Sequence, residues 1–151
     1  MAFNVLFVCT GNTCRSPMAE GLLRSQWPAT RRSGFTVASA GTVTVRGLPV
    51  SFEAAEVMRE AGIDISGHAA QPLTDALIDK ADLILALAQG HLGQIRDRFP
   101  SAEGKAFLLS TYADKKGPAR DVPDPAGEDL AAYRTVRDQI SRYTRAIAEK
   151  M

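Results

Sequence analysis

The sequence predicts an α/β protein with three layers, in which a four-stranded parallel sheet is flanked by helices on both faces. Short apolar runs alternate along the chain with segments of helical periodicity, and this order is typical of a parallel sheet. The 151 residues are enough for one domain with a sizeable core. Because the chain contains neither a repeat nor a linker, we expect a single domain over residues 1–151.

The expected strands are short runs of mostly apolar side chains, and the third is apolar enough to lie at the centre of the sheet. They cover Phe3–Cys9, Phe35–Gly41, Asp82–Ala88 and Lys105–Ser110.

The expected helices are recognised by their end signals and their periodicity. Ser16 is a favoured N-cap residue and Pro17 suits the first helical position, so a helix is expected to begin here and to run to Trp27. Gly62 is a stop signal for a helix that begins at Phe52. Further helices are expected over Pro72–Ala81, over Gly90–Phe99 and from about Asp129 to Lys150.

The composition excludes several classes of protein. The 18 basic and 17 acidic side chains give a net charge of +1, which favours neither nucleic acid nor a membrane surface as a partner. The sequence lacks an apolar run of about 18 residues and an N-terminal signal segment, so we expect a cytoplasmic protein. Cys9 and Cys14 show no metal-ligand spacing with His68 or His91. We expect a monomer that uses neither metal nor cofactor.

The segment that follows the first strand is the candidate ligand site, because ligands of parallel α/β sheets bind beyond the carboxyl ends of the strands. A tight loop here would turn successive backbone N–H groups into one concavity, and the next helix would add its positive end. Gly11 and Asn12 tolerate the left-handed backbone that such a concavity requires. The residues expected to bind an oxyanion are Thr10, Gly11, Asn12, Thr13, Cys14, Arg15 and Ser16.

Two side chains give this loop its chemistry. Arg15 offers a planar fork of donors that can hold two phosphate oxygens at once. Cys9 lies at the bottom of the loop, where such surroundings lower the pKa of a thiol from about 8.5 to roughly 3.5–7.5. The hydroxyl of Ser16 can stabilise the resulting thiolate. Taken singly, Cys9 could be a core residue and Arg15 a surface residue, but the strand before them and the helix after them favour a nucleophile and a phosphate ligand.

A nucleophile of this kind needs an acid to protonate the leaving group. Asp124 is the candidate, because Pro123 and Pro125 fix it in a stiff loop and a neighbouring phosphate favours its protonated form. An aspartate between two prolines can also be a plain turn residue.

The segments "VCTGNTCRSPMAE" and "DVPDPAG" resemble the low-molecular-weight protein tyrosine phosphatase family over nearly the whole chain. The resemblance implies a four-stranded parallel sheet and a phosphocysteine intermediate on Cys9. It also implies that Arg15 and the loop N–H groups hold the phosphate, and that Asp124 acts first as general acid and then as base. The residues that match the supporting network of the family are Asn12, Ser16, Ser39 and His68.

The substrate is indicated by two departures from the tyrosine-specific members. Thr13 stands where they carry a bulky aliphatic residue, and it resembles the protein-arginine phosphatase branch, whose loop is also "CTGNTCRS". Ala126 stands where both groups usually carry an aromatic residue, and Thr42–Val50 has no aromatic to enclose a phenol ring. We therefore expect a phosphatase of phosphorylated proteins that acts on phosphoarginine, with phosphotyrosine as the alternative and with Thr13 and Ala126 as specificity residues.

Two further functions are compatible with a loop of this kind. Arsenate reduction uses a related loop, but the known versions on this fold need more cysteines than Cys9 and Cys14. A non-catalytic module that binds phosphate or senses redox state would not need Asp124. Turnover of a chromogenic aryl phosphate separates such a module from an enzyme.

Overall fold

The computed structural model describes residues 2–28 and 33–151. All four strands pair in parallel, in the order β2-β1-β3-β4, and this confirms the predicted fold class. The strands are β1 (Phe3–Cys9), β2 (Phe35–Gly41), β3 (Leu83–Ala86) and β4 (Ala106–Leu108). The third strand is central, as predicted.

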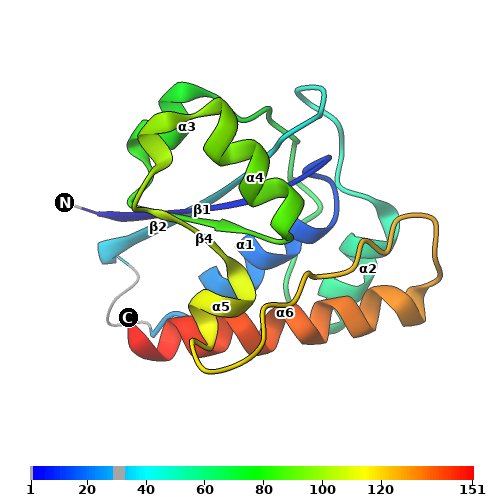
Figure 1. Cartoon of the computed structure of the whole chain (residues 1–151). Helices are drawn as coiled ribbons and strands as arrows, with labels where there is room; N and C mark the ends of the chain where they lie inside the picture. The colour runs from blue at the N-terminus through cyan, green and yellow to red at the C-terminus, as the bar shows by residue number, and fades with distance from the viewer. Residues whose placement is uncertain (1, 29–32) are drawn as a thin grey trace.

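Helices cover both faces of this sheet, with α3 and α4 on one side and α1, α5 and α6 on the other (Figure 1). The helices are α1 (Arg15–Gln26), α2 (Phe52–Glu60), α3 (Asp75–Lys80), α4 (Gln89–Arg98), α5 (Leu109–Ala113) and α6 (Leu130–Lys150), with a short 3₁₀ turn, η2, at Pro100–Ala102. Within the described ranges, no helix combines the length and the apolar character needed to cross a bilayer.

The two faces of the sheet build two separate cores, because successive side chains of a strand point to opposite faces. Phe7 of β1 belongs to the core under α1 and α6, together with Met18 and Ile140. Its neighbour Val8 belongs to the core under α3 and α4, together with Ile95. Each large apolar side chain buried in this way contributes about 1.5–3 kcal/mol.

The bounds of several elements differ by one to three residues from the sequence prediction, and the third strand covers Leu83–Ala86 instead of Asp82–Ala88. Two of the differences have a clear physical reason. The expected helix at Pro72 begins only at Asp75, because Thr74 is its N-cap and accepts a hydrogen bond from the backbone N of Leu77 at 3.2 Å. The fourth strand ends at Leu108 instead of Ser110, because its partner β3 ends at Ala86, directly opposite Leu108. The chain then continues as the short helix α5, which the sequence analysis did not predict.

The topology brings several segments together over the end of β1. The backbone N of Thr42, directly after β2, donates to the carbonyl of Cys9 at 2.9 Å. The backbone N of Leu87, directly after β3, donates to the carbonyl of Val8 at 3.1 Å, and Leu87 in turn accepts from Val122 at 2.8 Å. The loop before α6 is thereby fixed beside the first strand, although it lies more than a hundred residues away in the sequence.

Candidate active site

The β1–α1 loop (Thr10–Cys14) is built around the side chain of Asn12. Asn12 has a left-handed backbone with φ of 57°, as predicted for this position, and is fully buried. Its Nδ2 donates to Oγ of Ser16 at 2.8 Å and to Oγ of Ser39 at 2.9 Å, while its Oδ1 accepts from the backbone N of Gln71 at 3.0 Å. These three bonds offset the cost of a strained backbone and a buried amide.

A second layer of polar groups supports this network. Nε2 of His68 lies 2.8 Å from the carbonyl oxygen of Asn12, and because a carbonyl only accepts, the ring donates through Nε2. Ser39 donates to Glu20 at 2.7 Å, and Glu20 also accepts from Arg24 at 2.7 Å. The structure therefore brings together the four residues predicted as supports, Asn12, Ser16, Ser39 and His68.

Sequence reasoning did not find Glu20 or Gln71 as members of this network. Glu20 has a weak signal, because it lies four residues after Ser16 and so on the same face of α1. Gln71 contributes through its backbone N–H, and its side chain donates to the carbonyl of Ser39 at 3.0 Å. A contact made by backbone from a distant loop leaves no signal in a single sequence.

The hydroxyl of Ser16 is directed at Cys9, the predicted nucleophile. Ser16 is not the N-cap that the sequence suggested, because α1 already begins at Arg15 after Cys14, which makes no side-chain capping bond. Ser16 Oγ lies 2.8 Å from Cys9 Sγ and accepts its other bond from Asn12. Because the hydroxyl of Ser16 still has its own hydrogen after it accepts from Asn12, it can donate to the sulfur of Cys9.

Arg15 is a buried cation, and not all of its N–H donors have a hydrogen-bond partner in the described part of the chain. It is 6% exposed, and its Nη1 donates to the carbonyl of Val122 at 2.9 Å. Its Nη2 lies 3.7 Å from Oδ2 of Asp124, a carboxylate whose side chain is 51% exposed. Its Nε is buried and has no hydrogen-bond partner in the described part of the chain. A buried guanidinium of this kind is suited to an oxyanion.

Cys14 differs from Cys9 in its surroundings. Burial is the main cause that raises the pKa of Cys14 to about 11, and the negative charges of Cys9 and Asp124 add to it. Cys14 Sγ lies 3.9 Å from Oδ1 of Asp124. Cys14 is therefore a protonated thiol at neutral pH, and the carboxyl of Asp124 is within reach of the loop.

Three further contacts hold the loop from outside. Thr44 Oγ1 donates to the carbonyl of Gly11 at 2.6 Å, and the backbone N of Ser51 donates to the carbonyl of Thr13 at 2.8 Å. Thr10 Oγ1 lies 2.9 Å from Nε2 of His91, a buried residue of α4 that the sequence analysis considered only as a metal ligand. Burial is the main cause that lowers the pKa of His91 to about 4, with the charge of Arg15 next.

Of the two predicted specificity residues, one belongs to the loop and the other lies beside Asp124. Thr13 is half-buried, and Ala126 is exposed beside Asp124, whose Oδ1 accepts from the backbone N of Ala126 at 3.0 Å. Thr42–Val50 has no aromatic residue, but Phe52 comes two residues after Val50 and is 74% exposed. The backbone N of Ser51 donates to the carbonyl of Thr13, so α2, which begins at Phe52, starts close to the loop. Val43, Val45 and Leu48 are also exposed.

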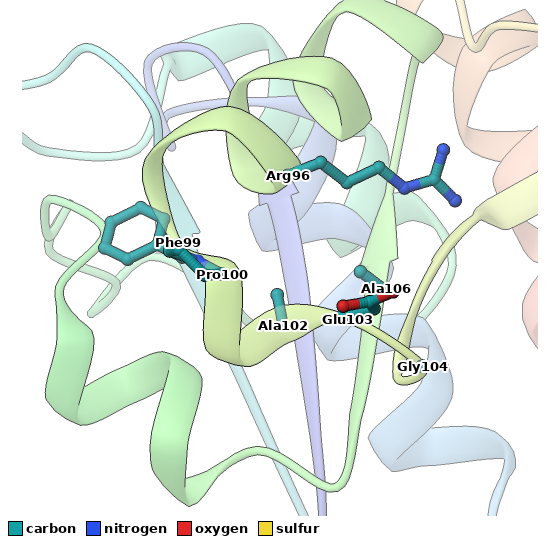
Figure 2. Close-up of a pocket in the computed structure, with 7 residues that line it drawn as sticks. All are labelled: Arg96, Phe99, Pro100, Ala102, Glu103, Gly104 and Ala106. Carbon is teal, nitrogen blue, oxygen red and sulfur yellow. The ribbon is translucent and has the colours of Figure 1, made fainter.

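A cavity of about 450 Å³ lies elsewhere, between the end of α4 and the start of β4 (Figure 2). The strands are parallel, so the start of β4 lies at the amino end of the sheet, whereas Cys9 lies at the carboxyl end. This cavity is therefore separate from the loop. It is lined by Arg96, Phe99, Pro100, Ala102, Glu103, Gly104 and Ala106. None of the predicted site residues is among them.

Comparisons with known proteins show the family to which the chain belongs and the proteins that it resembles. The model of a family described as low molecular weight phosphotyrosine protein phosphatase matches residues 4–151. The protein-arginine-phosphatase of Geobacillus stearothermophilus is 38% identical over 100% of this chain and 97% of its own length. A probable low molecular weight protein-tyrosine-phosphatase, EpsP, of Ralstonia nicotianae is 39% identical over 94% of this chain and 91% of its own length.

Solved structures give the same result. The YwlE arginine phosphatase from Geobacillus stearothermophilus superposes with a TM-score of 0.90 at 38% identity, covering 98% of this chain and 92% of that one. A mutant of the YwlE arginine phosphatase with a phosphorylated active-site serine has a TM-score of 0.89 at 35% identity, covering 98% of this chain and 95% of that one.

Proposed function

The chain belongs to the low molecular weight phosphotyrosine protein phosphatase family, and we propose that it hydrolyses phosphorylated protein side chains through a phosphocysteine intermediate on Cys9. The observation that supports this most directly is the convergence of Cys9, Arg15 and Asp124 on one loop. Arg15 bonds to the carbonyl of Val122 and lies 3.7 Å from Asp124, across more than a hundred residues of sequence. The hydroxyl oxygen of Ser16 lies 2.8 Å from the sulfur of Cys9.

The proposed reaction has two halves. In the first, the thiolate of Cys9 attacks phosphorus, an S–P bond forms, and the bond from phosphorus to the side-chain nitrogen or oxygen breaks. The leaving atom takes a proton from Asp124. In the second, water attacks the phosphocysteine and gives a proton to Asp124, the S–P bond breaks, and inorganic phosphate leaves. Arg15 and the loop N–H groups hold the phosphoryl oxygens throughout.

The two cysteines of the loop provide the test of the nucleophile. Cys9→Ser should abolish turnover of an aryl phosphate while inorganic phosphate still binds, because the oxyanion donors remain. Cys14→Ser should retain substantial activity, because Cys14 is a protonated thiol whose pKa is raised to about 11. Equal losses in the two variants would remove Cys9 from the role of nucleophile.

We propose phosphoarginine as the substrate side chain. A guanidinium brings several N–H donors into the site, and each one buried without an acceptor costs about 1–3 kcal/mol. The hydroxyl of Thr13 and the carboxylate of Asp124 at the mouth supply such acceptors. The protein-arginine-phosphatase among the relatives supports this choice.

Phosphotyrosine is the second candidate, and one observation favours it. Phe52 is 74% exposed and follows Ser51, whose backbone N donates to the carbonyl of Thr13, and an exposed aromatic ring at this position can contact a phenol ring. A tyrosine phosphatase among the relatives, EpsP, supports the same alternative.

The choice is tested by kcat/KM on phosphoarginine and phosphotyrosine peptides of the same sequence. For a phosphoarginine enzyme, Thr13→Ile should lower the first value and raise the second, a swing of roughly 10–200-fold if about 1–3 kcal/mol is involved. Thr13→Ser, which keeps the hydroxyl, is the matched control. A wild type that prefers phosphotyrosine, with a ratio unmoved by Thr13→Ile but reduced by Phe52→Ala, would establish the second candidate.

We also propose that the enzyme acts in the cytoplasm as a monomer. The proposed chemistry needs Cys9 as a free thiol, and both Cys9 and Cys14 are free in the structure. Reducing compartments preserve such thiols, whereas oxidising compartments do not. Cell fractionation and the molar mass in solution test the two statements.

A further inference from the structure

The helix α4 carries a buried histidine that the reaction described above does not use. His91 is 6% exposed, and its Nε2 lies 2.9 Å from Oγ1 of Thr10, the residue that follows Cys9. Its other ring nitrogen, Nδ1, is buried and has no hydrogen-bond partner among residues 2–28 and 33–151. The ring therefore meets the β1–α1 loop through Nε2.

The protonation state of this ring follows from its two nitrogens. A proton on Nδ1 would bury an N–H donor without an acceptor, which costs the full desolvation of that group. A proton on Nε2 is satisfied, because Thr10 Oγ1 accepts it. Burial and the nearby charge of Arg15 oppose a second proton and lower the pKa of His91 to about 4. At neutral pH, His91 is thus a neutral ring that donates through Nε2.

We propose that His91 is a positioning residue for phosphate binding, and that its Nε2–H fixes Thr10 so that the first turn of the β1–α1 loop keeps its phosphate-binding shape. The proposal rests on the proposed function, since it concerns the same phosphate. The backbone of Thr10 is held on one side, by the bond from the N of Val43 to its carbonyl at 3.0 Å. His91 restrains the side chain of Thr10.

The direction of this hydrogen bond has a chemical effect. When His91 donates to Thr10 Oγ1, the hydroxyl hydrogen of Thr10 is left for another partner. Thr10 is exposed and adjoins Cys9, so an anionic phosphoryl oxygen held in the loop is an acceptor that this hydroxyl can meet. His91 would then both restrain the loop and orient one of its hydroxyl donors.

A matched pair of variants isolates the hydrogen bond from the bulk of the side chain. Gln places an amide donor at about the position of Nε2, and Met has nearly the same shape without a donor. We expect His91→Met to weaken the binding of inorganic phosphate about tenfold and to lower kcat/KM for an aryl phosphate by a similar factor. His91→Gln should restore most of both. Gln94→Met, on the exposed face of α4, is the control for a methionine in this helix.

A double-mutant cycle asks whether the effect passes through Thr10. Thr10→Val removes the hydroxyl and keeps the shape. In that background, His91→Met should cause little further loss of phosphate affinity, because the partner is already gone. Independent, additive losses in the double variant would overturn the proposal, as would equal phosphate affinity in wild type and His91→Met.

The tautomer is tested without any turnover. The chain contains two histidines, so ¹⁵N NMR of the imidazole rings is assigned by the signals that His91→Gln removes. The proposal requires a protonated Nε2 and a bare Nδ1 at pH 7; a proton on Nδ1 overturns it. Failure of the proposed function is recognised separately, because wild type itself would then bind no phosphate and release none from its substrates.

Discussion

Asp124 is half exposed, and its carboxylate approaches both Arg15 and Cys14. It therefore stands where it can exchange protons with bulk water and still reach a group bound in the loop. Its Oδ1 accepts a hydrogen bond from the backbone N of Ala126, which restrains the carboxylate. This position suits the proposed role, in which Asp124 gives a proton to the leaving group and then takes one from the attacking water.

The proposed role of Asp124 as a general acid can be tested by varying the leaving group of the substrate. Asp124→Asn should lower kcat by about 10²–10⁴-fold, the range for loss of a general acid. The loss should shrink across a series of aryl phosphates as the leaving phenol becomes more acidic, because such a phenol leaves without a proton. A loss that is uniform across the series would indicate a structural role for Asp124.

His91 makes the fold sensitive to acid. Its pKa is about 6.5 when exposed and is lowered to about 4 in the folded protein, by burial first and then by Arg15, while Asp121 and Asp124 act in the opposite direction. Between these values the unfolded chain binds the extra proton, so the free energy of unfolding falls as the pH falls. The neutral ring of His91 makes its full contribution to the free energy of unfolding above pH 6.5. At pH 4 this free energy has fallen by about 3 kcal/mol.

His91→Gln should remove this part of the pH dependence. Urea unfolding at pH 7 and at pH 4.5 measures it: wild type should lose more stability between the two than the variant does. His68→Gln serves as the control histidine substitution. Parallel losses in wild type and His91→Gln would mean that the ring is not held neutral by the fold.

Site residues could be predicted from the sequence where a suitable residue type also has a suitable spacing from its neighbours. The spacing of Cys9, Arg15 and Ser16 after an apolar strand was enough to indicate an oxyanion site, and the left-handed Asn12 follows from the residue type. His91 was not predictable as a neighbour of Thr10. The two are 81 residues apart, and only the packing of α4 brings them together.

At the level of elements, the end of β2 is shaped to admit the loop. Gly41 pairs with Cys9 in the sheet, and a Cβ on Gly41 would lie 2.6 Å from the carbonyl oxygen of Thr10 and 2.9 Å from Cγ2 of Thr44. The backbone of the loop approaches β2 so closely that only glycine fits. The constraint is one of space, because the φ of Gly41 is not positive.

Gly41→Ala should therefore displace Thr10 and destabilise the fold by about 1–3 kcal/mol, the usual cost of overpacking. It should also weaken phosphate binding, because the loop moves. Urea unfolding and a phosphate titration measure the two effects. Gly34→Ala is the matched control, since a Cβ there meets nothing within 4 Å. Indistinguishable behaviour of the two variants would contradict the role assigned to Gly41.

The elements themselves were largely predictable, and their ends were not. Periodicity and apolar runs indicated the four strands and five of the six α-helices. The N-cap assigned to Ser16 was wrong because its hydroxyl is committed to Cys9, a contact made in three dimensions. The helix α5 was missed because β4 stops where its partner stops, and the length of β3 is set by the sheet.

At the scale of the whole molecule, bound phosphate would connect two loops that lie far apart in the sequence. The β1–α1 loop supplies Arg15, and the loop before α6 supplies Val122 and Asp124, which contact this arginine. A ligand that binds only when both loops are in place stabilises the native state by mass action.

Inorganic phosphate at about 100 times its Kd should stabilise the protein by about 2.7 kcal/mol. For a chain of this length, that corresponds to a rise in Tm of about 5–10 °C. Sodium chloride of equal ionic strength is the control. In Arg15→Lys the rise should be nearly lost, because a point charge does not replace a bidentate fork. A full rise in Arg15→Lys would show that phosphate binds elsewhere.

The bond from Arg15 to Val122 spans 107 positions, and this has a consequence for synthesis of the protein. A ribosome makes the cysteine and the arginine of the site more than a hundred residues before the aspartate. Throughout that interval the growing polypeptide holds a thiol without its acid and a guanidinium without its carbonyl partner. The ability to turn over substrate thus arrives late, once the carboxyl-terminal part of the chain has joined the part made first.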